Sequence, residues 1–230
     1  RLIDADADNL YQPAKGDSYI DRNRNGKFDP VWLAGFGSNR PAKGVHDPLW
    51  ARAIAFRNNG VTVAMVTLDA IGIFHEQFIE VRKSLDAALA IDHVTFSSLH
   101  NHESPDTMGL WSGPRPWPWN FDHANLDRIK KACKEAVEEA VRGLQPAEMY
   151  CAEAEIEPEG YVDDSRLPIV YDRKLCCARF VKPGTDETIA TLVSWGNHPE
   201  TLAGRNPLVT GDFCGYWRDG VEDGVPDPNG

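Results

Sequence analysis

The sequence lacks two features that would assign it to a common class of protein at once. No apolar run approaches the roughly 20 residues that a membrane-spanning helix requires. Positive charge is not in excess either, since 35 Asp and Glu residues outnumber 24 Lys and Arg residues and give a formal net charge of −11. A chain this acidic repels the phosphate backbone of nucleic acids. We therefore expect neither a transmembrane segment nor a nucleic-acid partner.

Cysteine is also scarce, and its spacing forms no motif. The chain has five cysteines, an odd number, and none follows the Cys-x-x-Cys spacing of zinc-binding or redox sites. Cys133 falls on the apolar face of a predicted helix, where a small core residue is the simpler interpretation. The cysteines therefore predict no metal centre and leave the cellular compartment open.

The two ends of the chain lead us to expect processing. The chain begins with Arg1 rather than Met, and residues 225–230 are rich in turn formers. We predict that an upstream segment such as a signal peptide has been removed, and that an exposed loop is cut after residue 230. A C-terminal fragment of the same precursor would then stay attached non-covalently.

An Asx-rich stretch at 21–29 resembles the first half of a calcium-binding loop. Oxygen-bearing side chains stand at positions 1, 3 and 5, a glycine at position 6 and a backbone carbonyl ligand at position 7. Position 12 is Trp32, so the bidentate glutamate of an EF-hand is missing. The stretch is either a structural calcium site, which would suit a secreted, extracellular or periplasmic protein, or a polar turn that needs no ion. The candidate calcium ligands are Asp21, Asn23, Asn25, Lys27 and Asp29.

The apolar pattern predicts the fold class. Helical spacing appears over 78–89 and 126–144, and Asn58-Asn59-Gly60 is a strong hairpin signal. The order strand, helix, strand between 61 and 99 implies a parallel crossover. We expect an α/β fold with a mixed, largely parallel sheet flanked by helices and with additional β-hairpins, and we find no internal repeat. The predicted strands are 51–57, 61–68, 94–99, 148–156, 175–181 and 188–195.

Residues 111–119 read Trp-Ser-Gly-Pro-Arg-Pro-Trp-Pro-Trp. The prolines exclude both a helix and a central strand. The stretch either forms an aromatic wall or lid over an apolar substrate or covers the core.

Polar residues follow the predicted strands where each of these strands ends. Asp69, His100 and His198 all stand just past a strand, at the edge where α/β sheets bind ligands. His46 and Asp212 are further candidates. Imidazole is the commonest metal ligand and carboxylates orient it, so this set predicts a metal site.

His100 and His102 point the same way on an extended segment, because residues two apart share a face. Either both bind one metal, or one binds while the other handles a proton or contacts the substrate. A catalytic zinc usually has three protein ligands and an open water position. Any ligands still missing would lie after residue 230.

Four stretches of the sequence match motifs of one protein family, and they occur in the same order as in that family. The sequence resembles the N-terminal catalytic domain of the neutral (alkaline, non-lysosomal) ceramidases, over roughly residues 34–217. Residues 97–105, Ser-Ser-Leu-His-Asn-His-Glu-Ser-Pro, are similar to the family's Ser-Ala-Thr-His-Thr-His-Ser-Gly-Pro. The other stretches are Gly-Phe-Gly through Gly-Val-His-Asp-Pro-Leu-Trp-Ala-Arg-Ala at 35–53, the strand ending in Leu-Asp at 63–69, and Trp-Gly-Asn-His-Pro at 195–199 with Thr-Gly-Asp-Phe-Cys-Gly-Tyr at 210–216.

The resemblance implies a zinc amidohydrolase that splits an N-acyl linkage in a small or lipid-like substrate. In this account the chain is the N-terminal part of a single metallohydrolase catalytic domain. Residues 1–33 form an extension with the calcium-like loop, and the rest of the domain lies on a separate or missing C-terminal segment. Zinc would lower the pKa of its water to about 7 and polarise the scissile carbonyl. The implied roles are zinc binding for His100 and His198, catalysis for His102, Asp69 and Arg166, and substrate binding for His46 and Asp212.

The chain departs from the family at Glu103 and Ser104, which replace Ser-Gly and change the charge beside the expected metal. Two other classes of protein share part of this pattern. A metallophosphoesterase shares Gly-Asn-His and His-x-His, but there the His-x-His pair comes last, after an early Asp-x-His that is absent here. A calcium-stabilised extracellular binding module would use the tryptophans as a ligand platform and perform no catalysis.

Overall fold

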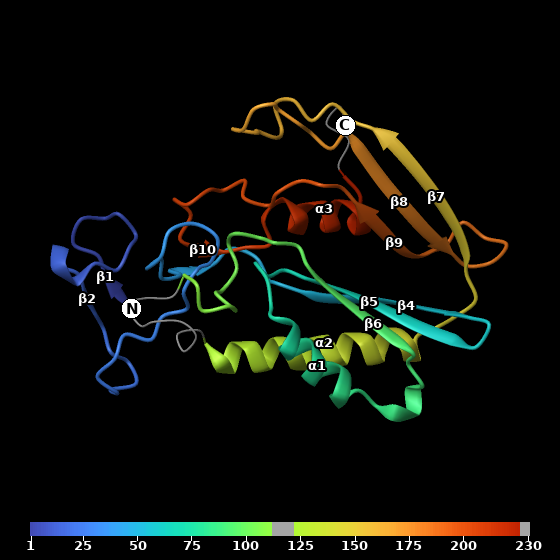
Figure 1. Cartoon of the computed structure of the whole chain (residues 1–230), viewed down its shortest axis with the longest axis horizontal. Helices are drawn as coiled ribbons and strands as arrows, with labels where there is room; N and C mark the ends of the chain where they lie inside the picture. Colours follow the sequence, from blue (N-terminus) through green and yellow to red (C-terminus); the bar gives the residue numbers. More distant parts are fainter. Residues whose placement is uncertain (112–121, 226–230) are drawn as a thin grey trace. The chain divides into compact units, whose positions relative to one another are not determined.

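The computed structural model describes residues 1–111 and 122–225 and divides into two compact units (Figure 1). The first unit comprises Arg1–Gly143 and Pro199–Gly230, and the second comprises Leu144–His198. The second unit is therefore an insertion, in sequence, between two parts of the first.

The first unit is built on a three-stranded sheet in the order β4-β5-β6. Strands β4 (Ala51–Asn58) and β5 (Val61–Leu68) pair antiparallel. Asn59 and Gly60 between them both have positive φ, 48° and 81°, as a two-residue hairpin turn of type I′ requires. Strand β6 (His93–Ser98) pairs parallel with β5. Burial alternates along β5, so that Ala64, Val66 and Leu68 face the core.

Helices α1 (His75–Ser84) and α2 (His123–Arg142) cover one face of this sheet and contact each other (Figure 1). Phe78 of α1 and Cys133 and Val137 of α2 join the buried face of β5 in one hydrophobic cluster. The side chain of Asp122 caps α2 by accepting a hydrogen bond from the Asn125 N–H at 3.0 Å.

Two short sheets extend the first unit. Strands β1 (Leu2–Ile3) and β2 (Ser18–Tyr19) pair antiparallel near the N-terminus. Strands β3 (Gly44–Val45) and β10 (Leu208–Val209) pair parallel, and helix α3 (Asp212–Asp223) follows β10. The β3–β10 pair, with the hydrogen bond from the Gly211 N–H to Asp47, holds residues 44–47 beside residues 208–211.

The second unit is an antiparallel meander in the order β7-β8-β9. Its strands are β7 (Glu148–Glu155), β8 (Lys174–Val181) and β9 (Thr188–Ser194). Every residue of β7 is exposed, whereas Phe180 and Val181 of β8 are buried.

The predicted α/β class, with a mixed sheet, flanking helices and hairpins, is confirmed. The expectation of a largely parallel sheet is corrected, because most strand pairs in the described residues are antiparallel. The predicted second helix is α2, which begins at His123 because Asp122 caps it.

The predicted helix over 78–89 is shorter than expected. Helix α1 ends at Ser84, and Leu85 is extended, with φ −64° and ψ 147°. A short 3₁₀ helix, η2 (Ala87–Leu89), follows after Asp86, whose side chain accepts a hydrogen bond from the Ala88 N–H. A second short 3₁₀ helix, η1 (Pro13–Lys15), lies near the N-terminus.

Among the described residues, none of the helices combines the length and the apolar character that crossing a membrane requires. The predicted aromatic wall or lid at 111–119 lies outside the described residues, apart from Trp111.

Candidate metal centre

The first histidine of the pair follows strand β6 and is fixed by the neighbouring chain. The backbone N–H of His100 donates to the Ala70 carbonyl at 3.1 Å, and His100 has a left-handed φ of 65°. Its ring nitrogen Nδ1 lies 2.7 Å from the Ile71 carbonyl, which can only accept. Nδ1 therefore carries the proton, and Nε2 keeps its lone pair for a metal.

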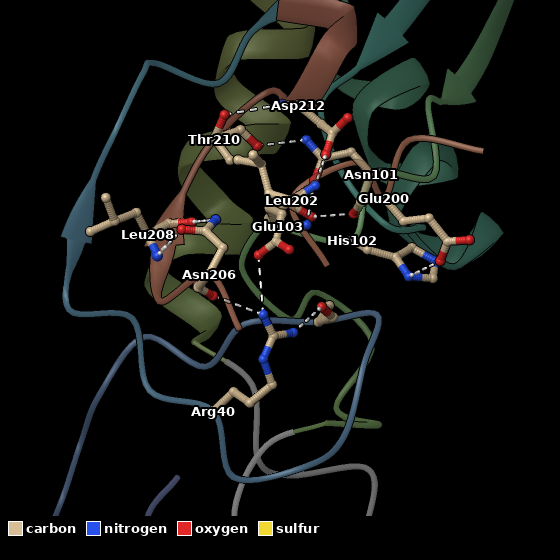
Figure 2. A network of polar contacts seen from close by, with 12 residues as sticks. Arg40, Asn101, His102, Glu103, Glu200, Leu202, Asn206, Leu208, Thr210 and Asp212 are labelled. Carbon is tan, nitrogen blue, oxygen red and sulfur yellow. Dashed lines mark hydrogen bonds and ion pairs between the residues drawn. The ribbon is translucent and has the colours of Figure 1, made fainter. Parts of the chain in front are cut away.

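The second histidine is more deeply placed. His102 is buried, and its ring lies edge-on to the rings of His100 and Phe36, with 5.0 Å between centroids in each pair. Its Nδ1 lies 3.3 Å from Oε2 of Glu200, as Figure 2 shows. Glu200 therefore orients this ring from one side.

Gly35 gives the His102 ring its space. Gly35 has a positive φ of 97°, and a Cβ built on it would lie 2.4 Å from Cγ of His102. A contact that short is not tolerated, so only glycine allows the ring to sit where it does. The Gly-Phe-Gly at 35–37 therefore has a steric reason next to the candidate site.

The third histidine is linked to this turn through its neighbour in sequence. The backbone N–H of His102 donates to the carbonyl of Pro199 at 3.1 Å, and Pro199 follows His198 directly. His100, His102 and His198 each offer one ring nitrogen, and these nitrogens lie within 4.8 Å of one another. Imidazole nitrogens are ligands that suit zinc, so this cluster offers zinc ligands and a further imidazole beside them.

A buried ion pair supports the turn that carries the histidines (Figure 2). Glu103 and Arg40 are both buried, and Arg40 Nη2 lies 3.1 Å from Oε2 of Glu103. Arg40 also donates to the carbonyls of Ala34 at 3.2 Å and Asn206 at 3.0 Å. Burial raises the pKa of the Glu103 carboxyl to about 7, although the Arg40 guanidinium acts to lower it.

Asn101 ties the same turn to the segment before α3. Its Nδ2 donates to the Thr210 carbonyl at 2.8 Å, and its Oδ1 accepts from the Glu103 N–H at 2.9 Å. The Thr210 N–H in turn donates to the Glu103 carbonyl at 3.2 Å. These contacts hold the histidine turn to the start of α3.

The two predicted substrate-binding residues lie at the β3–β10 end of the first unit. Asp212 is buried, has a positive φ of 54°, and accepts from the Phe213 N–H at 2.6 Å. His46 is exposed, and its Nε2 lies 2.6 Å from the Tyr216 hydroxyl. Asp47 joins the two regions by accepting from the Gly211 N–H at 2.6 Å.

Asp69 has a different environment from the one that a general base needs. Its Oδ1 and Oδ2 each lie 2.6 Å from a guanidinium nitrogen of Arg218, and Oδ2 also accepts from the Trp50 N–H at 2.9 Å. Both oxygens are occupied by a permanent cation. The geometry favours a structural role for Asp69, and its catalytic role stays a prediction.

Arg166 lies in the second unit, with its side chain 88% exposed, and it pairs with Asp164 of its own loop at 3.4 Å. Its predicted catalytic role stays a prediction.

The calcium-like loop satisfies many of its own hydrogen bonds. Asp21 accepts from the N–H groups of Arg24 and Gly26, both at 2.7 Å. Asn25 accepts from the Lys27 N–H at 2.9 Å and donates to Asp29 at 2.6 Å. Asn23 accepts from the Asn25 N–H at 3.4 Å. These bonds are those of a polar turn, and calcium binding at this loop stays a prediction.

Sequence reasoning missed several residues that build the site. No local sequence pattern marks Arg40, Glu200 or Arg218. Each of these residues contacts a partner that lies far away in the sequence. Gly35 and Asn101 lie inside quoted motifs, but nothing in the letters shows that one makes room for a ring and the other bridges to Thr210.

The comparisons with known proteins identify the family of the chain. The family model described as "Neutral/alkaline non-lysosomal ceramidase, N-terminal" matches residues 25–228. The chain is therefore a protein of the neutral ceramidase class. It is a member of the neutral/alkaline non-lysosomal ceramidase family. The family resemblance drawn from the four motifs is confirmed.

The relatives are distant and longer. Neutral ceramidase A of Dictyostelium discoideum is 24% identical over 193 residues, which cover 75% of this chain and 27% of that protein. A solved structure described as ceramidase complexed with C2 is similar with a TM-score of 0.72 at 19% identity, over 86% of this chain and 34% of that one. The neutral ceramidase of Pseudomonas aeruginosa has a TM-score of 0.70 at 18% identity, over 87% of this chain and 34% of that one. This chain therefore spans about a third or less of these relatives, and the structural likeness shows the fold.

Proposed function

We propose that this chain provides the metal-binding, N-terminal part of an amidohydrolase that cleaves the N-acyl linkage of a ceramide-like lipid. Family membership over residues 25–228 supports the reaction class. The substrate class comes from the name of the Dictyostelium relative, of which this chain spans 27%. The observation that carries the proposal is the approach of three imidazole nitrogens to within 4.8 Å of one another.

In this proposal His100 and His198 bind zinc. Zinc, when bound, would lower the pKa of its water to about 7 and polarise the acyl carbonyl. His100 presents Nε2 because its Nδ1–H is held by the Ile71 carbonyl. This carbonyl fixes both the tautomer and the direction of the ring before any metal arrives.

His102 is the residue that we propose to move a proton. Its ring is fixed by the Gly35 backbone on one side and by the Glu200 carboxylate near Nδ1 on the other. A carboxylate there stabilises the protonated imidazole. His102 is therefore suited to hold a proton at Nε2 and to give it to the departing amine.

His46, Asp212 and Arg166 keep the roles proposed from the resemblance, and the remaining zinc ligands would come from residues outside this chain. We likewise propose that the protein is processed from a longer precursor, stays associated with the C-terminal fragment, and acts outside the cytoplasm.

Zinc affinity tests the core of the proposal. The purified chain should bind one zinc ion in competition with a chromophoric chelator. His198→Ala and His100→Asn should each weaken binding by about tenfold to a hundredfold or more. Asparagine is chosen at 100 because it tolerates the left-handed backbone there. His93→Ala, at an exposed position of β6, is the matched control and should leave the affinity unchanged.

Equal affinity in the wild type and in both site variants would overturn the metal site. The substrate class is tested separately, with the full precursor assayed against an N-acyl sphingoid base and against a short N-acyl amide. Zinc binding without hydrolysis of either compound would keep the metal site and reject the proposed reaction.

A further inference from the structure

Residues 2–13 and 19–30 are two copies of one motif. The first copy reads Leu-Ile-Asp-Ala-Asp-Ala-Asp-Asn-Leu-Tyr-Gln-Pro, and the second reads Tyr-Ile-Asp-Arg-Asn-Arg-Asn-Gly-Lys-Phe-Asp-Pro. Isoleucine, the first aspartate and the final proline are identical, and Asp/Asn alternation and an aromatic residue recur at matched places. The expectation of no internal repeat is therefore wrong.

Features of the backbone conformation repeat together with the amino-acid sequence. Ala7 and Arg24 occupy matched positions and have left-handed φ values of 61° and 58°. Asn9 and Gly26, also matched, have φ values of 66° and 74°. Strand β1 begins the first copy, strand β2 ends on Tyr19, the first residue of the second copy, and the two strands pair antiparallel. The two loops therefore share left-handed residues at the same two positions.

Side-chain contacts follow the same correspondence. Oδ2 of Asp4 accepts from the Asn9 N–H at 3.0 Å, as Oδ2 of Asp21 accepts from the Gly26 N–H at 2.7 Å. The matched aromatic rings of Tyr11 and Phe28 lie against each other, with 4.4 Å between centroids. A duplicated loop whose two copies meet through strands and aromatic residues resembles a paired calcium-loop module.

The first copy carries three carboxylates where the second has one. Asp4, Asp6 and Asp8 each offer an oxygen, and these oxygens lie within 4.8 Å of one another. The side chain of Asp4 is only 9% exposed, and its Oδ1 has no hydrogen-bond partner in the part of the chain that the structure describes. A buried carboxylate oxygen without a partner is costly, and a bound cation removes that cost.

We propose that Asp4, Asp6 and Asp8 form a calcium site in the first copy. Calcium prefers charged oxygen ligands at alternate positions of such a loop. The site is independent of the zinc proposal, because it precedes the part of the chain that matches the family model. It also differs from the loop at 21–29, where asparagines replace two of the carboxylates.

Two lysines pair with these carboxylates: Nζ of Lys43 lies 3.2 Å from Oδ2 of Asp4, and Lys15 is the competitor that calcium must displace from Asp6 and Asp8. Its Nζ lies 3.2 Å from Oδ2 of both Asp6 and Asp8, and its side chain is half exposed. Exposed ion pairs of this kind are weak, so calcium can replace the ammonium group. Removing the Lys15 charge should therefore strengthen calcium binding, an effect that damage to the fold would not produce.

Isothermal titration of the whole chain with calcium chloride tests the proposal. The wild type should bind calcium, and Asp6→Asn and Asp8→Asn, both at exposed positions, should each weaken binding by about tenfold or more because a ligand charge is lost. Lys15→Gln should strengthen binding by about twofold to tenfold. The exposed controls Asp163→Asn and Lys83→Gln should change nothing.

Three results would overturn the site. They are the absence of calcium binding to the wild type at millimolar calcium, affinity unchanged by Asp6→Asn and Asp8→Asn, and binding that is lost only in Asp21→Asn. The last result would assign the ion to the second copy instead.

Discussion

Individual residues at the candidate site hold backbone conformations that their side chains do not favour. His100 and Asp212 have left-handed φ values of 65° and 54°. For most residues other than glycine this conformation costs roughly 1–2 kcal/mol, and less for aspartate, whose side chain can hydrogen-bond locally. Distant hydrogen bonds maintain it, such as the one from the His100 N–H to the Ala70 carbonyl. The protein therefore gives up some folding free energy to hold these side chains in their orientations.

The close approach of Gly35 to His102 gives the sharpest prediction at this scale. Gly35→Ala should destabilise the protein by roughly 1–3 kcal/mol, because the new Cβ meets the ring and the left-handed backbone disfavours alanine. It should also lower the rate of amide hydrolysis by the full precursor, because it moves the His102 ring that we propose to transfer the proton. Urea unfolding and the hydrolysis assay measure the two effects. Gly37→Ala is the control, since within the described residues a Cβ there meets nothing within 4 Å.

Glu103 gives a prediction about pH. Its pKa is raised by burial to about 7 from an ordinary value of 4.5, so between these values the folded protein binds more protons than the unfolded chain. The contribution of Glu103 to stability is thus fullest below pH 4.5 and falls as pH rises to about 7. The unfolding free energy of the wild type minus that of Glu103→Gln should decline across this range. A difference independent of pH would contradict the burial-raised pKa.

At the scale of elements, much of the fold follows from local pattern. The alternation in β5, the Asn-Gly turn before it and the apolar stripe of α2 predict these elements nearly to their ends. The predicted helix over 78–89 ends early, at Ser84. The side chain of Asp86 accepts the Ala88 N–H and the Asp86 N–H donates to Glu138, and these two bonds replace helical bonds around Leu85. Local periodicity does not reveal such a side-chain competitor.

The ion pair between Asp69 and Arg218 joins the end of β5 to α3 and predicts a large effect. The Asp69 side chain is 1% exposed, so Arg218→Met would leave a buried carboxylate unpaired. The expected loss of unfolding free energy is about 3–5 kcal/mol. Arg128→Met is the control, since that arginine is 68% exposed and lies 4.0 Å from Asp122. Its expected loss is below about 1 kcal/mol. Equal losses in urea unfolding would reject a buried structural pair.

At the scale of the whole molecule, the sequence predicts the class and the histidines but not their support. His100 and His102 follow a strand and share a motif, so spacing alone finds them. The pair of Glu103 with Arg40 spans 63 residues, and that of Asp69 with Arg218 spans 149. The local sequence around these residues does not indicate a contact between segments so far apart in the chain. These contacts require the tertiary structure.

The same long spans affect how a nascent chain matures on the ribosome. Asp69 leaves the exit tunnel long before Arg218, and the entire second unit, Leu144–His198, is translated in between. During that interval a carboxylate destined for burial must remain hydrated, and β5 cannot close against α3. Slower elongation after residue 198 would prolong the time for which Asp69 is exposed. A chaperone bound at the end of β5 would protect this part of the nascent chain during that time.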